Sequence, residues 1–287
     1  MPRLFSRLTS FVYHREACNC ALAIAMAIAA LGYASADAAP VAVRFPEGVT
    51  HGFLQMRSLG GEIIGHGEMI QAAKAGDVIE SQLVFRFKDG SLHDETVTFS
   101  QHRVFTMVRY HLIQRGPSFP EQVDISLDRG TGEYNVRSKS GEAGKEQVLA
   151  GEFHLPMDAY NGMLIMLLKN LQKGADDTVS VLAFMPTPQV ITLQLLAVDE
   201  QAIRIGDVAK KTIHYVFKPR IGMIRTLVGK ATGKLPANFH YDCWMLADEV
   251  SSFVKFEGPL QLMGAIVQIE LMSPLLAAKP ADEKTPH

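Results

Sequence analysis

Hydrophobic and polar residues alternate along most of the chain after Val41, in short runs that glycine, proline and aspartate separate. In the run 123–128, for example, Val, Ile and Leu alternate with Asp, Ser and Asp. Successive side chains of a β-strand point to opposite faces, so this alternation predicts strands with one buried face and one face in water. Roughly a dozen such runs, with turn residues between them, predict an all-β sandwich or barrel rather than alternating strands and helices.

Two pairs of these runs carry the signals of tight hairpins. Gly60-Gly61 separates the first two runs, and Asp89-Gly90 separates the run 78–87 from the run 92–101. Asp-Gly between alternating runs is among the strongest local indications of a β-hairpin. The main strands predicted before residue 154 are 52–57, 62–70, 78–87, 92–101, 103–114, 123–128 and 148–153, and those predicted after residue 178 are 179–184, 190–198, 202–208, 212–217, 240–246, 252–256 and 265–272.

The segment from His154 to Gly174 interrupts this alternation and predicts a helix over 157–173. Its apolar residues recur at helical spacing and extend around most of the helix. Asp158 and Asn161 are expected at the helix start, where their side chains can accept hydrogen bonds from free backbone N–H groups. The apolar residues are Met163, Leu164, Ile165, Met166, Leu167, Leu168 and Leu171.

A helix that is apolar nearly all round must be covered on more than one side. The predicted fold class is therefore mainly β, with few helices: a large curved antiparallel sheet or an incomplete barrel wrapped around one central helix. We expect residues 39–274 to form a single β-rich domain, with a first half over 41–153 and a second half over 178–273. The tail, 275–287, is polar and contains proline, and we expect it to be disordered.

Residues 1–38 have the three parts of a secretory signal peptide. Arginines 3, 7 and 15 precede an alanine-rich apolar run, and Ala36-Asp37-Ala38 is a small-x-small cleavage site. Cleavage after Ala38 predicts a periplasmic or secreted protein. The alternative is an uncleaved N-terminal anchor, because residues 17–36 approach the length of about 20 residues that spans a bilayer.

Composition narrows the classes of function. The chain has 287 residues, 47% of them hydrophobic, and a net charge of −2 without a basic cluster, which argues against binding of nucleic acid. Removal of the signal peptide leaves Cys243 as the sole cysteine, so an internal disulfide is excluded in the mature chain. Cys243 stands beside Trp244 in a strand-like run, which predicts a buried apolar side chain rather than a nucleophile.

Motifs for metal binding and catalysis are missing from the sequence. The histidines are scattered, with no pair at the i, i+4 spacing of a zinc protease, and neither a Cys-x-x-Cys nor a Gly-x-Ser-x-Gly motif occurs. We therefore predict no metal, no cofactor and no catalytic residue. One enzymatic alternative stays open, a hydrolase whose site is built from His66, His93, His111 and nearby acidic residues.

The leading functional hypothesis is an exported, non-catalytic cell-envelope protein that binds an apolar ligand or lipid in the concave face of the sheet. Thirteen methionines suit an adaptable apolar interior. The basic, glycine-broken segment 219–236 is a candidate for transient contact with a membrane. A structural or protein-interaction component of the envelope is the alternative, and the oligomeric state stays open. The residues expected to line the ligand site are Met163, Leu164, Leu167, Leu168 and Leu171.

Two motifs carry a resemblance to a known group of proteins. The first is His154-Leu-Pro-x-Asp-x-Tyr160-Asn-Gly162, and the second is the C-terminal series Trp244-Met-Leu, Phe253-Val-Lys-Phe-Glu-Gly258 and Val267-Gln-Ile-Glu-Leu-Met-Ser273. With the export signal, they resemble exported bacterial β proteins, and the C-terminal end is similar to the last hairpin of the periplasmic lipoprotein-carrier fold. This resemblance implies an incomplete barrel with helices in its concave face and binding of acyl chains or another apolar group. It carries over no catalytic residue.

Overall fold

The computed structural model describes residues 40–141, 144–172, 176–184, 187–205, 208–220, 240–261 and 264–272, all within one compact unit, 38–287. The predicted signal peptide, 1–38, and the tail, 275–287, lie outside the described residues, as does nearly all of the basic segment 219–236. None of the helices in the described ranges combines the length and apolar character needed to cross a membrane.

The described residues form fourteen strands and one helix, α2. In chain order they are β1 (Thr50–Ser58), β2 (Ile63–Ala73), β3 (Val78–Phe87), β4 (Leu92–Ser100), β5 (Thr106–Arg115), β6 (Glu121–Asp128), β7 (Glu133–Ser140), β8 (Gln147–Glu152), α2 (Leu164–Asn170), β9 (Asp177–Ala183), β10 (Gln189–Ile205), β11 (Val208–Pro219), β12 (Tyr241–Leu246), β13 (Phe253–Pro259) and β14 (Ile266–Leu271).

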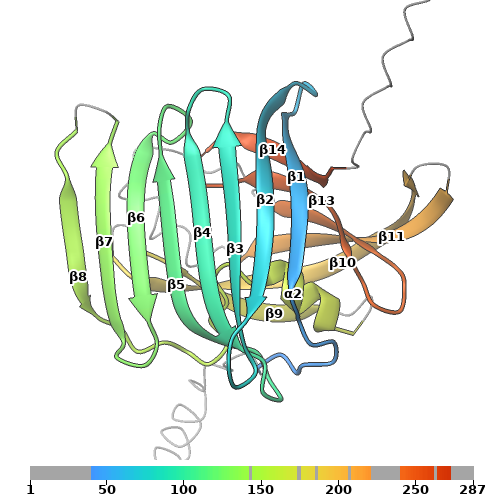
Figure 1. Cartoon of the computed structure of the whole chain (residues 1–287), viewed down its shortest axis with the longest axis horizontal. Coiled ribbons are helices and arrows are strands. Elements are labelled where there is room, and N and C mark those ends of the chain that lie inside the picture. Colours follow the sequence, from blue (N-terminus) through green and yellow to red (C-terminus); the bar gives the residue numbers. More distant parts are fainter. Residues whose placement is uncertain are drawn as a thin grey trace, which may run out of the picture. The chain divides into compact units, whose positions relative to one another are not determined.

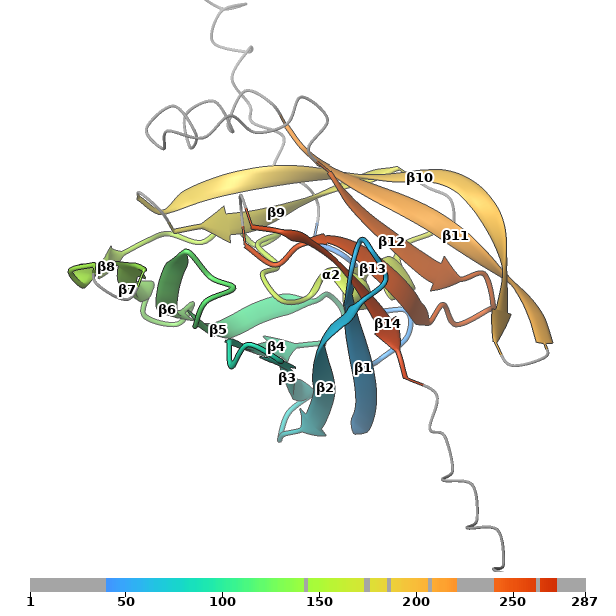
Figure 2. The same cartoon turned by 90° about the horizontal axis from the view of Figure 1, so that it is seen from above.

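All fourteen strands belong to one antiparallel sheet that does not close. Strands β1 to β8 form one meander and β9 to β14 form a second, and pairing of β1 with β14 joins them, while β8 and β9 are the two edges. Figure 1 shows the first meander in front of strands of the second, and Figure 2 shows the sheet curling so that α2 lies between the two halves. The predicted fold class, a mainly β protein with a large curved antiparallel sheet, is confirmed.

The alternating sequence pattern determines which side of the sheet faces inward. In β6, Val123, Ile125 and Leu127 are buried, whereas Asp124 and Ser126 between them are exposed. The predicted hairpins at Gly60-Gly61 and Asp89-Gly90 also form, joining β1 to β2 and β3 to β4. Local alternation therefore predicted both the strands and their orientation.

One strand is longer than the sequence pattern predicts. The predicted strands 190–198 and 202–208 are largely parts of a single strand, β10, of 17 residues. The polar residues Asp199 to Gln201 suggest a turn, but they pair with β11 across a bulge after Ala197. Both faces of β10 are largely exposed there, because the β10–β11 pair extends past the core, so polar side chains are tolerated on either side.

The predicted helix over 157–173 is wrong in extent, because α2 covers only Leu164–Asn170. Met163 is the residue before the first turn, and no side chain caps that end, so Asp158 and Asn161 do not start the helix. Their side chains bind β9 instead: Ser180 Oγ donates to Asp158 Oδ2 at 2.6 Å, and Asn161 exchanges two hydrogen bonds with the Leu182 backbone.

Backbone geometry also keeps the helix short. Gly162 has φ +70°, a left-handed conformation that favours glycine and separates the preceding turns from α2. At the other end Leu171 is extended, and the Asn170 side-chain oxygen accepts hydrogen bonds from the backbone N–H groups of Arg44 and Phe45 at 2.8 and 2.7 Å. The N-terminal segment of the described chain therefore holds the end of α2 in place.

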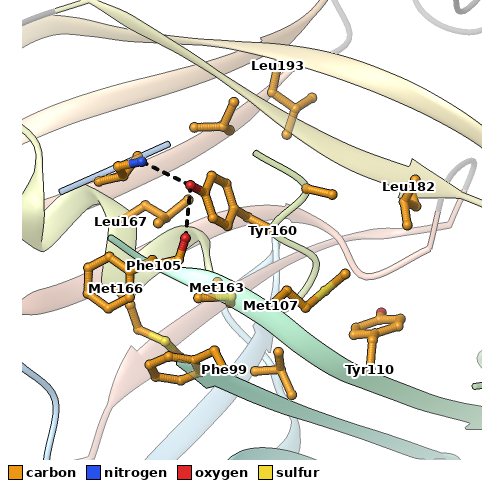
Figure 3. Packing of buried hydrophobic residues seen from close by; sticks show 14 of the residues in the cluster. Phe99, Phe105, Met107, Tyr110, Tyr160, Met163, Met166, Leu167, Leu182 and Leu193 are labelled. Carbon is orange, nitrogen blue, oxygen red and sulfur yellow. Dashed lines mark hydrogen bonds between the residues drawn. The ribbon is translucent and has the colours of Figure 1, made fainter. Parts of the chain in front are cut away.

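The core lies between α2 and the concave face of the sheet. Tyr160, Met163 and Leu167 are fully buried there, beside Phe99 and Phe105 in Figure 3. The Tyr160 hydroxyl accepts a hydrogen bond from the Val41 backbone N–H at 2.9 Å and donates one to the Phe105 carbonyl at 3.3 Å (Figure 3). Because this tyrosine satisfies its hydroxyl group with backbone atoms of two separate segments, it can lie at the centre of an apolar core.

Replacement of Leu167 by Asp tests the structural role of α2. We expect Leu167→Asp to lower the free energy of unfolding by about 3–5 kcal/mol, because a fully buried apolar side chain becomes an unpaired charge. Urea denaturation followed by fluorescence measures this loss. Leu59→Asp is the matched control, since Leu59 is 56% exposed, and it should change stability little. Similar stability of both variants and the wild type would contradict burial of the helix.

Candidate ligand-binding cavity

A cavity of about 780 Å³ lies beside α2, lined by residues of the helix and of both halves of the sheet. From the helix, Leu164, Ile165 and Met166 line it. The first meander contributes residues such as Leu54 and Phe85, and most of the other lining residues are apolar as well. Both the volume and the apolar lining are typical of sites that bind small molecules.

The cavity coincides only in part with the residues expected from the sequence. Of the five predicted lining residues, Leu164 lines the cavity. The other four are buried in the core and do not line the cavity: Met163, Leu167, Leu168 and Leu171. The sequence pattern shows that α2 is apolar nearly all round, but periodicity alone does not distinguish a side chain facing the core from one facing a cavity.

Exposed residues mark where the cavity meets the protein surface. Val250 and Leu271 line it and are 43% and 49% exposed. Lys169 of α2 also lines it and forms an ion pair with Glu47, with 2.9 Å between Nζ and Oε1. The cavity is therefore a mostly apolar space with exposed apolar residues at its rim, and Glu47 neutralises the charge of Lys169.

Glu95 of β4 places a carboxyl group in this apolar lining. The Tyr110 hydroxyl donates a hydrogen bond to Glu95 Oε1 at 2.8 Å. Burial raises the pKa of Glu95, and the hydrogen bond from Tyr110 opposes that shift only in part. Burial, together with the nearby Glu95, also raises the pKa of Tyr110, so its hydroxyl stays protonated and remains a donor.

His93, two residues before Glu95, is buried in the same lining, with 4% of its surface exposed. Gln114 Nε2 lies 3.0 Å from His93 Nδ1 and 2.8 Å from the Leu260 carbonyl oxygen. Burial lowers the pKa of His93 to about 4, against a smaller opposing effect of Asp94, so the ring is neutral at pH 7.

The hydrogen bonds of Gln114 determine the tautomer of this neutral ring. The Leu260 carbonyl oxygen can only accept, so the Gln114 atom beside it is the amide nitrogen, which also donates to His93 Nδ1. The proton of the imidazole is therefore on Nε2. Among the described residues Nε2 has no hydrogen-bond partner. No other buried side-chain nitrogen or oxygen in the described part of the chain lacks one.

The histidines of the hydrolase alternative do not come together. His66 of β2 and His111 of β5 are exposed on the outer face of the sheet, where His111 lies 3.0 Å from Asp124, whereas His93 is buried on the inner face. Within the described ranges, no group of three or more His, Cys, Asp and Glu side chains is arranged to hold a metal ion.

Cys243 of β12 is fully buried, as its apolar neighbours in the sequence predict. Burial raises the pKa of its thiol, with a smaller contribution from Asp242. Because the thiolate is the reactive form of cysteine, this side chain packs as an apolar group.

A signal for His93 and Glu95 is present in the sequence of this strand. Val97 and Phe99 alternate with threonines, which indicates that the odd-numbered residues of this strand face inward. Extending the same period by four residues toward the N-terminus places Glu95 and His93 on the buried face as well. A half-buried acid and a buried histidine on one strand face are more informative than histidines distributed over the whole sequence.

Comparison of this chain with known protein families, with characterised proteins and with solved structures finds no match.

The buried histidine should make stability depend on pH. Its pKa is about 4 in the folded protein and about 6.5 in the unfolded chain, so between these values only the unfolded chain binds the proton. The stabilising contribution of neutral His93 is thus present above pH 6.5 and is lost as the pH falls towards 4. From pH 7 to pH 4.5 we expect the wild type to lose about 2–3 kcal/mol more unfolding free energy than His93→Gln.

Urea denaturation at a series of pH values measures this difference. The raised pKa of Glu95 acts in the opposite direction, favouring the folded protein at low pH, but it does so in both proteins and cancels in the comparison. His66→Gln, on the exposed outer face, is the control and should follow the wild type. Parallel pH profiles for the wild type and His93→Gln would show that His93 titrates normally in the folded protein.

Proposed function

We propose that this chain is a non-catalytic protein of the cell envelope that binds an apolar ligand or a lipid between α2 and the concave face of the sheet. The cavity of about 780 Å³ is the observation that carries the proposal. Its volume falls within the range of roughly 300–1,000 Å³ that ligand sites occupy, and both meanders and the helix contribute to its wall.

The character of the wall supports an apolar ligand. Helix residues Leu164, Ile165 and Met166 line the cavity together with strand residues such as Phe217 and Phe256. Burial of apolar surface contributes roughly 25 cal/mol per Å², so an acyl chain or a similar group gains most of its binding free energy from this wall. Methionine adds an adaptable surface that suits ligands of varied shape.

The rim supports entry of such a ligand from outside. Val250 and Leu271 are exposed and line the cavity, and Val49, next to lining residues Gly48 and Thr50, is 81% exposed. Exposed apolar side chains at the edge of a concave site are typical of surfaces that meet apolar partners. Export, which the sequence of residues 1–38 predicts, would bring the protein to the compartment in which envelope lipids are handled.

Native mass spectrometry of the protein purified from its own envelope fraction tests the proposal. We expect a bound apolar molecule in the wild type, and loss of most of it in Leu164→Trp, because the larger side chain would fill space beside α2. Leu149→Trp is the matched control: Leu149 is also half-buried but does not line the cavity, so its ligand content should equal that of the wild type. A wild-type protein without any bound apolar molecule, even after incubation with lipid vesicles, would contradict the proposal.

A further inference from the structure

His93 and Glu95 form a polar pair in the mostly apolar lining of the cavity. We infer that this pair binds the uncharged oxygen-bearing group of an amphiphilic ligand, such as the ester or amide of an acyl chain, while the chain lies against α2. This inference rests on the proposed function and names the class of ligand that the same cavity takes.

The two residues are placed to act on one group. They stand two positions apart on β4 and face the same side of the sheet, which puts their Cα atoms roughly 7 Å apart. In the neighbouring strand β3, Leu83 pairs with Glu95 and Phe85 with His93, and both of these apolar residues also line the cavity. Apolar side chains of β3 therefore flank the polar pair.

His93 supplies a hydrogen-bond donor. Its Nδ1 accepts from Gln114, so its Nε2 carries the proton, and none of the described residues accepts from it. A buried donor without an acceptor is costly, so such an atom in a ligand-sized cavity points to an acceptor on the ligand. Neighbouring side chains cover Nε2, so they must shift when a ligand oxygen reaches it; the Phe85 and Phe119 rings lie 6.1 and 6.4 Å from the imidazole between centroids.

Glu95 supplies the second polar contact. Its Oε1 is engaged by the Tyr110 hydroxyl, while no hydrogen bond to Oε2 occurs among the described residues. Burial favours the protonated, uncharged form of this carboxyl group. Oε2 can accept a hydrogen bond from a hydroxyl or amide group of the ligand, and the protonated form that burial favours can also donate one to an ester carbonyl oxygen.

The charges of the lining favour an uncharged group over a fatty-acid anion. Of the described lining residues, Lys169 is the one with a permanent positive charge, and it already pairs with Glu47. A ligand carboxylate beside Glu95 would therefore be desolvated without a free cation to compensate it. An uncharged ester keeps the same apolar chain and avoids this penalty.

Three ligands with an unsaturated hydrocarbon chain of the same length but different polar groups separate these cases: 1-monooleoylglycerol, oleate and oleylamine. Displacement of the fluorescent probe N-phenyl-1-naphthylamine from the purified full-length protein at pH 7.5 measures their affinities. We expect 1-monooleoylglycerol to bind most tightly to the wild type. In His93→Phe its affinity should fall about five- to tenfold, the effect of one lost hydrogen bond, while binding of the probe is retained.

Two further variants complete the experiment. His66→Phe makes the same substitution on the outer face and should leave all three affinities unchanged. Glu95→Gln keeps an uncharged polar side chain and should retain binding of 1-monooleoylglycerol. Tightest binding of oleylamine to the wild type, lost in Glu95→Gln, would show that Glu95 acts as a carboxylate and would overturn the inference.

The outcomes distinguish this inference from the proposed function. If neither the probe nor any of the three ligands binds the wild type, the cavity is not an apolar ligand site and both proposals fail. If the probe binds but the three ligands are equivalent, or oleate binds most tightly, the inference alone is wrong. Should His93→Phe fail to fold, the ranking of the three ligands on the wild type and on Glu95→Gln still decides.

Discussion

The structure depends on covering the apolar concave face of a sheet that does not close. In a closed barrel, opposite walls cover one another, whereas here β8 and β9 remain separate edges. The chain covers the inner face by passing the connection between these two edges through the space between the meanders. Tyr160, Met163 and Leu167 of this connection are fully buried, and they contact side chains from both halves. The hydrophobic effect therefore holds the two halves together, because both bury apolar side chains against this connection.

The short length of α2 explains why the interior is not completely filled. Seven helical residues span roughly 10 Å, much less than the width of the sheet that they must cover. The turns before the helix and the segment from Val41 to Glu47 cover further parts of the concave face. Hydrogen bonds of Tyr160 and Asn170 and the ion pair of Lys169 hold this segment in place. The space that remains beside Leu164, Ile165 and Met166 is the cavity. The short helix between the two halves thus accounts both for the packing of the core and for the candidate binding site.

The polar residues of the interior differ in how their hydrogen bonds are satisfied. Asp158 and Asn161 bind β9, and Tyr160 binds backbone atoms, so these three stabilise the fold. His93 has an unsatisfied donor and Glu95 has one carboxyl oxygen without a described partner. Residues that leave hydrogen-bonding capacity unused in an apolar cavity are the ones whose presence is best explained by a ligand.

The sequence by itself determined where most strands lie and which of their faces turns inward, because the two-residue period of a β-strand is a local property that residues such as Val123, Ile125 and Leu127 display directly. It also located an apolar segment between the halves. The tertiary structure alone decided that Asp158 and Asn161 bind β9 rather than start a helix, that β10 continues through Asp199, and that His93 lies near Gln114 and Leu260. These outcomes depend on contacts between residues far apart in the chain. Packing determines which hydrogen-bond partners meet and which volume stays unfilled, and no local sequence pattern encodes packing.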